Sequence, residues 1–372
     1  MRLHLLGLPH TQTTSEYLTC AYTQKVVKFG KMMTQLGHEV IIYAGEENEA
    51  ICAEHVPIIT EAERHAWFGT GFDTALTPFE WDVNQPYWRA YNERAAAEVL
   101  KRANPRDLLL LTTSIQKPVY DVVRHAVGMT GVEWGVGYQG VWLDFAVFES
   151  YAWMHHVYGL QDRHDGKNYD AVVPNFFDRF DFRVAEKKDD YLLYVGRMIR
   201  RKGVLTAALV AERMGMRLIA AGPGGSPVPG GVKTVEHDFI PGVEYVGPVG
   251  PDERSELMSK ARALLAPTTY IEPFGGVAVE AMMSGTPAVT TDWGAFTETV
   301  VPGVTGYRFR TIHEGADAVE RAMELDKRSI REEAVNRWSL ETVGLMYEEH
   351  FGRLDSLWEW NWDGTPVGPP VV

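Results

Sequence analysis

Cysteine is scarce in this chain of 372 residues, which contains only Cys20 and Cys52. Two cysteines form no disulfide framework, and their spacing fits no metal-ligand pattern. Long apolar runs are missing too, because no stretch reaches the roughly 20 residues that a membrane-spanning helix needs. These absences exclude a disulfide-stabilised secreted domain and an integral membrane segment, and they predict a reducing, cytoplasmic setting.

A basic surplus is also absent, since 36 Lys and Arg face 50 Asp and Glu and the formal net charge is −14. Both halves of the chain are acidic. This balance excludes a general nucleic-acid binder, which needs a basic footprint. An anionic ligand would therefore be held by a few placed cations and backbone amides rather than by the overall field.

The length suits two domains, and two α/β patterns follow one another along the chain. The first segment meets Pro9 after a few apolar residues, which predicts a strand rather than a signal peptide. The expected strands are Leu3–Leu8, Glu39–Ala44, Leu108–Leu111, Tyr191–Val195, Arg217–Ala221, Ala263–Ala266 and Ala288–Thr291. The expected helices are about Tyr17–Leu36, Val204–Met214, Asp252–Ala261 and Val277–Ser284, the first of them N-capped by Thr13, Thr14 or Ser15. Such alternation predicts open parallel sheets that bind ligands beyond the carboxyl ends of their strands.

A loop that carries Glu272 runs through Gly275 and Gly276 into one of these helices. Glycines let the backbone come close to a ligand, and the N–H groups of the first helical turn point at it. The entry therefore predicts a diphosphate site, with Glu272 before the helix and Glu280 one turn inside it as acceptors for sugar hydroxyls. The alternative is a capped surface helix with two incidental glutamates, which the apolar, glycine-rich entry disfavours.

A second cluster follows the strand Tyr191–Val195, where Gly196 and Arg197 stand at its carboxyl end and Lys202 precedes the next helix. Arginine grips phosphate oxygens in a bidentate manner, and lysine adds a compact charge. Arg197 and Lys202 are therefore candidates to neutralise a nucleoside diphosphate. Arg200 and Arg201 fit a solvated basic loop.

Together, the two clusters resemble the motifs of retaining glycosyltransferases with the GT-B fold, glycosyltransferase family 4. The Gly-Arg…Lys-Gly motif is met by Arg197 and Lys202, and the Glu-x7-Glu motif by Glu272 and Glu280. Further segments resemble the family in order: Val173–Asp178, Val246-Gly247-Pro248-Val249, Asp292–Glu298 and Gly303–Gly306. The resemblance is dense over residues 173–310, and it implies two facing Rossmann-like domains with a cleft between them.

The resemblance also implies residue roles. Arg197 and Lys202 would bind the diphosphate, Glu280 the donor ribose, and Glu272 the donor sugar. The predicted catalytic residues are thus Glu272, Arg197 and Lys202. The predicted donor-binding residues are Glu280, Phe274, Gly275, Gly276, Val277, Gly196, Val246 and Gly247. The sequence has no Asp-x-Asp, in agreement with a family that relies on Arg and Lys rather than a metal, so no metal site and no cofactor besides the nucleotide-sugar co-substrate are expected.

The predicted domains are 1–182 for the acceptor, 183–337 for the nucleotide-sugar, and 338–372 for a C-terminal helix returning to the first domain and a tail. In the first domain, Thr13, Thr14, Tyr138 and Gln139 are candidates for an acceptor or diphosphate loop, and helix capping is the alternative for the threonines. Aromatic residues cluster at 134–153, either as an acceptor wall or, given the helical spacing of Tyr138, Trp142 and Phe145, as core. The lysines Lys25, Lys28 and Lys31 are expected on a solvated face rather than on a membrane.

The predicted function is retaining transfer of a hexose, with UDP-glucose as the expected donor and GDP- and ADP-sugars left open. The acceptor is a hydroxyl of unassigned type, on a saccharide, lipid, small molecule or modified nucleobase. Two alternatives remain from the same residues: a non-hydrolysing sugar-nucleotide epimerase of the same fold, and a non-catalytic nucleotide-sugar binding module. Nucleoside diphosphate release that depends on an acceptor separates the three.

Overall fold

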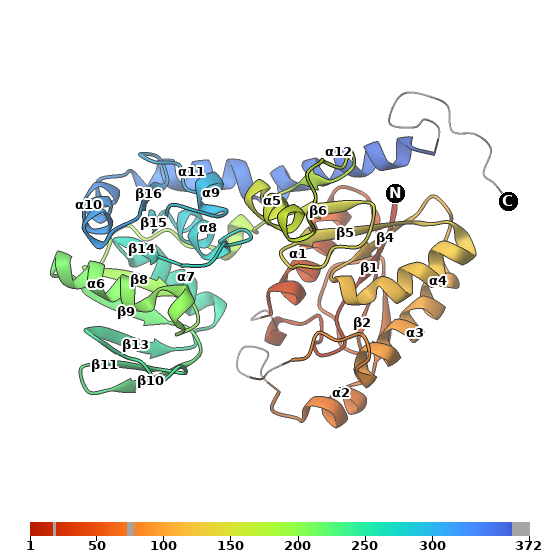
Figure 1. Cartoon of the computed structure of the whole chain (residues 1–372), viewed down its shortest axis with the longest axis horizontal. Helices are drawn as coiled ribbons and strands as arrows, with labels where there is room; N and C mark the ends of the chain where they lie inside the picture. The colour runs from red at the N-terminus through yellow and green to blue at the C-terminus, as the bar shows by residue number, and fades with distance from the viewer. Residues whose placement is uncertain (18–19, 73–76, 78, 359–372) are drawn as a thin grey trace. The chain divides into compact units, whose positions relative to one another are not determined.

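The computed structural model describes residues 1–17, 20–72, 77 and 79–358, so the end of the predicted helix and tail 338–372 lies outside them from residue 359. The chain divides into two compact units. Unit 1 comprises Met1–Glu149, Met154–Pro174 and the chain from Val343. Unit 2 comprises Ser150–Trp153 and Asn175–Thr342. Each unit is built on its own parallel sheet (Figure 1), which confirms the predicted alternation of strands and helices.

Unit 1 contains a seven-stranded parallel sheet in the order β3-β2-β1-β4-β5-β6-β7. Its strands are β1 (Arg2–Leu6), β2 (Glu39–Gly45), β3 (Glu54–Ile59), β4 (Leu108–Leu111), β5 (Thr130–Val136), β6 (Ala146–Phe148) and β7 (Ala171–Val172). Its helices are α1 (Ala21–Gln35), α2 (Glu61–Phe68), α3 (Pro86–Leu100), α4 (Lys117–Val127), α5 (Tyr151–Leu160, with its first turn in unit 2) and α12 (Leu340–Ser356, mostly in unit 1). The central strand β4 is apolar throughout because both faces of the sheet are covered.

Helix α12 packs on α1 inside unit 1. The ring of Tyr347 meets that of Phe29 edge-on, with centroids 5.3 Å apart. A Cβ atom on Gly344 would lie 2.9 Å from Leu36 Cδ1, so the two helices approach closely at this glycine. The last part of the described chain is therefore part of the first unit's core.

Unit 2 contains a six-stranded parallel sheet in the order β13-β9-β8-β14-β15-β16. Its strands are β8 (Tyr191–Val195), β9 (Arg217–Ala221), β13 (Val243–Gly247), β14 (Ala263–Ala266), β15 (Ala288–Thr291) and β16 (Gly306–Phe309). Its helices are α6 (Val204–Met214), α7 (Pro251–Lys260), α8 (Gly276–Met283), α9 (Phe296–Thr299), α10 (Ile312–Met323) and α11 (Lys327–Trp338). A small antiparallel sheet of β10 (Gly225–Val228), β11 (Gly231–Thr234) and β12 (Phe239–Pro241) was not predicted.

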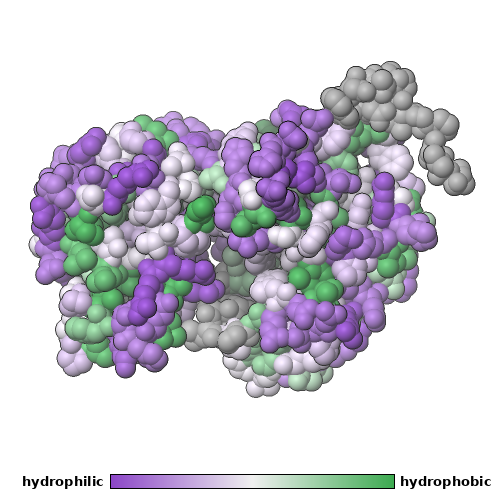
Figure 2. All heavy atoms as spheres, in the orientation of Figure 1, coloured by the Kyte–Doolittle hydropathy of each residue, from purple (hydrophilic) through white to green (hydrophobic). Residues whose placement is uncertain are grey.

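The hydrophobic core of unit 2 lies on both faces of its sheet. One cluster joins the strands to α7, α8 and α11, and the other joins them to α6 and α10. On the face of the molecule that Figure 2 shows, hydrophobic residues of each unit lie in small areas among hydrophilic ones. The apolar side chains of the strands are buried beneath the covering helices.

The predicted start of the first helix is wrong. Helix α1 begins at Ala21 after the N-cap residue Cys20, and a 3-10 turn occupies Ser15–Tyr17. The predicted capping threonine Thr13 donates its hydroxyl proton to Asn48 Oδ1 at 2.5 Å instead. A contact distant in sequence therefore replaces the local cap that the composition suggested.

The predicted helical spacing of Tyr138, Trp142 and Phe145 is also wrong, because the segment between β5 and β6 contains no helix. Gly140 has φ +77° there, and the Trp142 side chain is 66% exposed. The buried carboxylate of Glu133 on β5 accepts the backbone N–H groups of Trp142 and Leu143, at 2.8 and 2.9 Å, and so fixes the loop in a non-helical path.

Lys25 is buried rather than solvated, contrary to the expectation. It is 6% exposed, and its Nζ lies 2.6 Å from Glu149 Oε1 and donates to the Gly135 carbonyl at 2.8 Å. The basic edge predicted on this helix thus contributes one of its three lysines to the core of unit 1. A buried charge of this kind is tolerated only because it is paired and hydrogen-bonded.

We expect Lys25→Met to lower the free energy of unfolding by about 3–5 kcal/mol, because it leaves the Glu149 carboxylate buried without a cation. Urea unfolding measures the change. Lys101→Met, which removes an exposed pair with Glu98, is the control and should cost less than about 1 kcal/mol. If Lys25→Met unfolds as Lys101→Met does, the pair contributes nothing to stability.

Candidate functional site

The entry to helix α8 is shaped by glycine and by one buried ring. Gly275, with φ +77°, is the N-cap residue, and no side chain caps the helix. Phe274 is 3% exposed and stacks on Phe177, with ring centroids 6.2 Å apart. The Phe274 side chain thus anchors the loop from inside the core. The N–H groups of Gly276 and Val277 belong to the first turn, where they lack intrahelical acceptors and favour an anion.

Glu272 lies in this loop and is 5% exposed. Its Oε1 accepts from Lys202 Nζ at 2.7 Å, and its Oε2 accepts from the Tyr270 hydroxyl at 2.7 Å. Lys202 Nζ also contacts the Tyr270 hydroxyl at 2.5 Å. Burial and the neighbouring Glu272 raise the pKa of Tyr270 well above its usual value, so the phenol keeps its proton as a donor. The structure therefore joins two predicted site residues, Lys202 and Glu272, directly, and Tyr270, which was not predicted, contacts both of them.

Glu280 lies one turn inside α8 and is 8% exposed. Its Oε2 is 3.4 Å from Nε of Arg254 on helix α7. The second carboxylate of the predicted motif is thus also buried and paired with a cation. Arg254 had no predicted role, since it comes from a helix with no motif of its own.

Three strand ends meet beside this loop. The N–H of Gly196, after β8, donates to the Ala221 carbonyl at 2.9 Å, and the N–H of Gly222 donates to the Gly247 carbonyl at 2.8 Å. A Cβ atom on Gly222 would lie 2.2 Å from the Gly196 carbonyl oxygen, so only glycine allows this approach. Val246, also predicted to contact the donor, is 41% exposed on β13.

Arg197 follows Gly196, and its side chain is exposed. Its positive charge acts to lower the pKa of Tyr270, against the larger rise that burial causes. Among the residues that the structure describes, no carboxylate forms an ion pair with the Arg197 guanidinium. Its five N–H donors are therefore open to a ligand.

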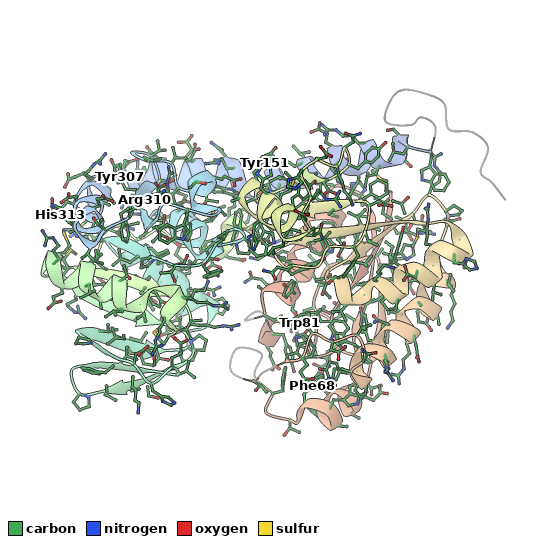
Figure 3. The ribbon with its side chains drawn as sticks, viewed as in Figure 1. Phe68, Trp81, Tyr151, Tyr307, Arg310 and His313 are labelled. Carbon is green, nitrogen blue, oxygen red and sulfur yellow. The ribbon has the colours of Figure 1, made fainter. Side chains whose placement is uncertain are left out.

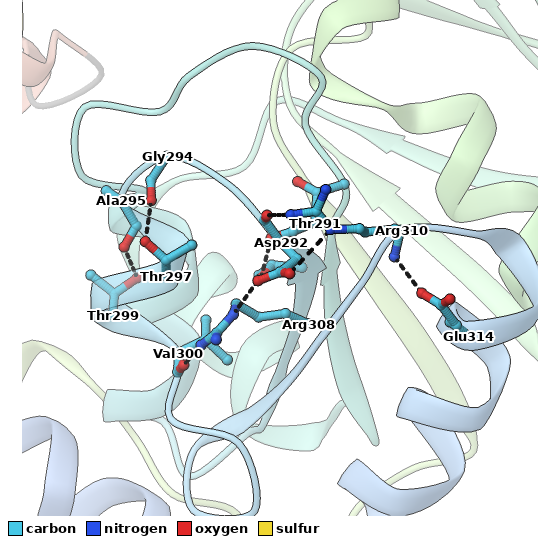
Figure 4. A network of polar contacts seen from close by, with 11 residues as sticks. Thr291, Asp292, Gly294, Ala295, Thr297, Thr299, Val300, Arg308, Arg310 and Glu314 are labelled. Atoms are coloured by element: carbon cyan, nitrogen blue, oxygen red, sulfur yellow. Dashed lines mark hydrogen bonds and ion pairs between the residues drawn. The ribbon is translucent and has the colours of Figure 1, made fainter. Parts of the chain in front are cut away.

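The segment after β15, whose polar contacts Figure 4 shows, lies against the Glu272 loop. Asp292 accepts from Arg308 Nε at 2.8 Å and from Arg310 Nε at 3.2 Å, and these two cations lower its pKa. The segment then turns through Gly294, and the N–H of Ala295 donates to the Glu272 carbonyl at 3.1 Å. A Cβ atom on Gly294 would lie 2.9 Å from the Glu272 nitrogen, which brings the two backbones into contact.

The unit 1 candidates lie in two loops, after β1 and after β5, at the carboxyl edge of that sheet. Thr13 is bound to Asn48, and the buried Thr14 hydroxyl has no hydrogen-bond partner among the described residues. The Tyr138 hydroxyl donates to Glu133 Oε1 at 3.1 Å, whereas Gln139 is exposed. Tyr138 is thus held by the sheet, and Gln139 is directed to solvent.

His10 is a buried residue of the first loop that had no predicted role. Phe68 and Trp81, both labelled in Figure 3, meet its ring edge-on with centroids 6.3 and 5.7 Å away, and the Phe79 ring centroid is 3.8 Å away. Burial, and then the charge of Arg64, lower the pKa of His10 to about 3. The imidazole is therefore neutral at neutral pH.

Neither a metal cluster nor a membrane-spanning helix is found in the described part of the chain. No group of three or more His, Cys, Asp and Glu side chains there is arranged to hold a metal ion. No helix there is both long and apolar enough to cross a bilayer.

Part of unit 2 is similar to one family of known proteins. Residues 189–324 match the family model of the glycosyl transferases group 1. A stretch of 120 residues is 37% identical to the glycogen synthase of Mycobacterium tuberculosis, covering 31% of this chain and 29% of that protein. The chain thus matches less than a third of the length of this curated relative.

Solved structures are similar over nearly the whole chain. AviGT4, a glycosyltransferase involved in avilamycin A biosynthesis, has a TM-score of 0.68 at 22% identity and covers 95% of this chain and 98% of its own. HepE of Anabaena in complex with UDP-glucose has a TM-score of 0.63 at 14% identity and covers 95% of this chain and 100% of its own. At these identities the similarity concerns the fold.

We expect Gly275→Ala to destabilise unit 2 by about 1–3 kcal/mol, because the residue has positive φ and its new Cβ would lie 2.4 Å from the Phe296 ring. Thermal unfolding measures the loss. Gly276→Ala is the matched control: its Cβ would lie 3.5 Å from Phe177 Cζ, an ordinary contact. Equal stability of the two variants would contradict the conformational role of Gly275.

Proposed function

We propose that this chain, which has the GT-B fold and a glycosyl transferases group 1 domain at residues 189–324, is a glycosyltransferase that moves a hexose from a nucleotide diphosphate to an acceptor hydroxyl. The observation that carries the proposal is the contact of Lys202 with Glu272 beside the glycine entry of α8. It brings a cation, a sugar-binding carboxylate and an anion-binding helix start together in one loop cluster.

The donor is assigned from the chemistry of this cluster. The diphosphate would lie against the first N–H groups of α8, with Arg197 and Lys202 as its cations. Glu280, oriented by Arg254, would accept from the ribose hydroxyls, and Glu272 from the hexose. UDP-glucose is the proposed donor, and the UDP-glucose complex of the structurally similar HepE supports it.

The proposed reaction retains the anomeric configuration. The bond between the anomeric carbon and the diphosphate oxygen breaks, and a bond to the acceptor oxygen forms on the same face of the sugar. The departing phosphate takes the proton of the acceptor hydroxyl. The task of the protein is then to stabilise the charge on the leaving diphosphate, which Arg197, Lys202 and the α8 N–H groups do without a metal.

Binding of the diphosphate would add a third partner to Lys202. Without a ligand, its ammonium is shared between Glu272 and Tyr270. An ammonium can donate three hydrogen bonds, and only two are used here. A phosphate oxygen can therefore accept the third without breaking the other two. Lys202 would thus link the leaving group to the carboxylate that holds the sugar.

We expect UDP and UDP-glucose to stabilise the wild-type chain by mass action, by about 2.7 kcal/mol at a ligand concentration of 100 times Kd. The melting temperature should rise accordingly. Lys202→Met should lose most of this shift because the diphosphate loses a direct cation. Arg200→Met, which removes an exposed arginine paired with Asp238 in the same loop, should keep it. Parallel screens with GDP- and ADP-glucose test the base, and a full shift with Lys202→Met would contradict the assignment.

We expect Glu272→Gln to lower acceptor-dependent release of UDP from UDP-glucose by about 10²–10³-fold, the effect of removing one group that acts on the transition state, while UDP still binds. Release is measured with and without a panel of saccharide acceptors. Conversion of UDP-glucose into an epimeric UDP-sugar, without an acceptor and without net release of UDP, would indicate the epimerase. Binding of UDP-glucose with neither reaction would indicate a binding module. Normal transfer by Glu272→Gln would show that the site is assigned wrongly.

A further inference from the structure

A short segment of the chain lies in unit 2 although the residues on both sides of it belong to unit 1. This segment is Ser150–Trp153, and it contains the first turn of helix α5. Tyr151, labelled in Figure 3, begins the helix. The turn contacts the loop that carries Glu272 through Ser150, and it contacts helix α9 through the N–H groups of Tyr151 and Ala152.

The first contact is made by Ser150, which is 2% exposed. Its hydroxyl donates to the Pro273 carbonyl at 2.7 Å and accepts the N–H of Trp153 at 3.0 Å. Pro273 has no N–H group, so its carbonyl is the only polar backbone atom between Glu272 and Phe274. Ser150 therefore fixes the peptide that links the sugar-binding carboxylate to the start of α8.

The second contact is made by Glu298 on helix α9. Its two carboxylate oxygens accept the N–H groups of Tyr151 and Ala152, at 3.0 and 2.8 Å. A carboxylate at a helix N-terminus is favoured by both hydrogen bonds and the helix dipole. Glu298 thus holds the same turn that presents Ser150 to the loop.

Together, these contacts connect the Glu272 loop to helix α9 on one side and to the Ser150–Trp153 turn on the other. Residue Ala295, which precedes α9, donates its N–H to the Glu272 carbonyl, and Glu298 leads from α9 back to Ser150 and Pro273. The far end of α9 is tied down too, because Arg337 donates to the Glu298 carbonyl at 2.9 Å. Asp292, with Arg308 and Arg310, fixes the start of the segment (Figure 4).

We propose that Ser150 and Glu298 are positioning residues, which set the Glu272–Gly275 loop in the geometry that binds the donor sugar. The inference rests on the proposed function, since it assumes that Glu272 faces the sugar. Neither residue touches the substrate. Each acts through backbone atoms of the loop, where a displacement of about 1 Å can cost 10²-fold in rate.

The test separates the sugar from the nucleotide. Ser150→Ala removes the hydroxyl that holds Pro273. Glu298→Gln leaves one acceptor oxygen for the N–H groups of Tyr151 and Ala152, and it places an NH₂ group against the second N–H group. Both variants should lower the kcat of transfer from UDP-glucose by about tenfold or more. Both should keep the Kd for UDP within about twofold of wild type, because Arg197, Lys202 and the α8 amides are untouched.

Ser339→Ala is the matched control. Ser339 is also 2% exposed and caps helix α12 by accepting the N–H of Thr342 at 3.3 Å, without a contact to the Glu272 loop. It should lower the melting temperature as Ser150→Ala does but leave kcat unchanged. Two independent variants keep the test valid if one of them fails to fold.

Wild-type kcat in both Ser150→Ala and Glu298→Gln would overturn the inference. A loss of kcat in Ser339→Ala as large as in those two variants would overturn it as well, because it would show an effect of stability alone. Failure of the proposed function is seen separately, in the wild-type chain. If that chain neither binds UDP nor releases it from UDP-glucose, the donor assignment is wrong, and the inference that depends on it falls with it.

Discussion

The structure of the site depends on one constraint: the Glu272 carboxylate is buried, and a buried charge must be paired. Lys202 supplies the cation and Tyr270 a second hydrogen bond, so both carboxylate oxygens are satisfied before any ligand arrives. These partners come from two different loops, after β8 and after β14. The pairing therefore fixes the two loops against each other and leaves the glycine entry of α8 beside them.

Much of the fold and part of the site could be predicted from local sequence. Strands such as Leu108–Leu111 and Tyr191–Val195 are continuous apolar runs, because a parallel sheet is buried on both faces, and they were placed correctly. The turn through Gly275 into α8 was equally visible, since glycine before an apolar helix is a local requirement of backbone geometry. The two motifs assigned Lys202 and Glu272 to the same ligand, but the direct contact between the two side chains was not predicted.

The rest depends on contacts between residues distant in sequence. Nothing local indicates that Arg254 pairs with Glu280, or that Ser150 binds a carbonyl 123 residues away. The same limit explains the errors. Lys25 has the spacing of a solvated edge but is neutralised by Glu149, and the spacing of Tyr138 and Trp142 suits a helix that Glu133 prevents. When a charged residue has its partner far along the chain, its neighbours in sequence give the wrong prediction of whether it is buried.

The balance of charge in the site agrees with an anionic ligand, although the chain as a whole has a net charge of −14. Glu280 and Arg254 neutralise each other, as do Glu272 and Lys202. Arg197 is then an exposed cation with no carboxylate partner among the described residues, and its charge acts on Tyr270. An acidic chain repels general polyanions, so the proposed diphosphate would be held by individually placed cations and backbone N–H groups rather than by the overall charge.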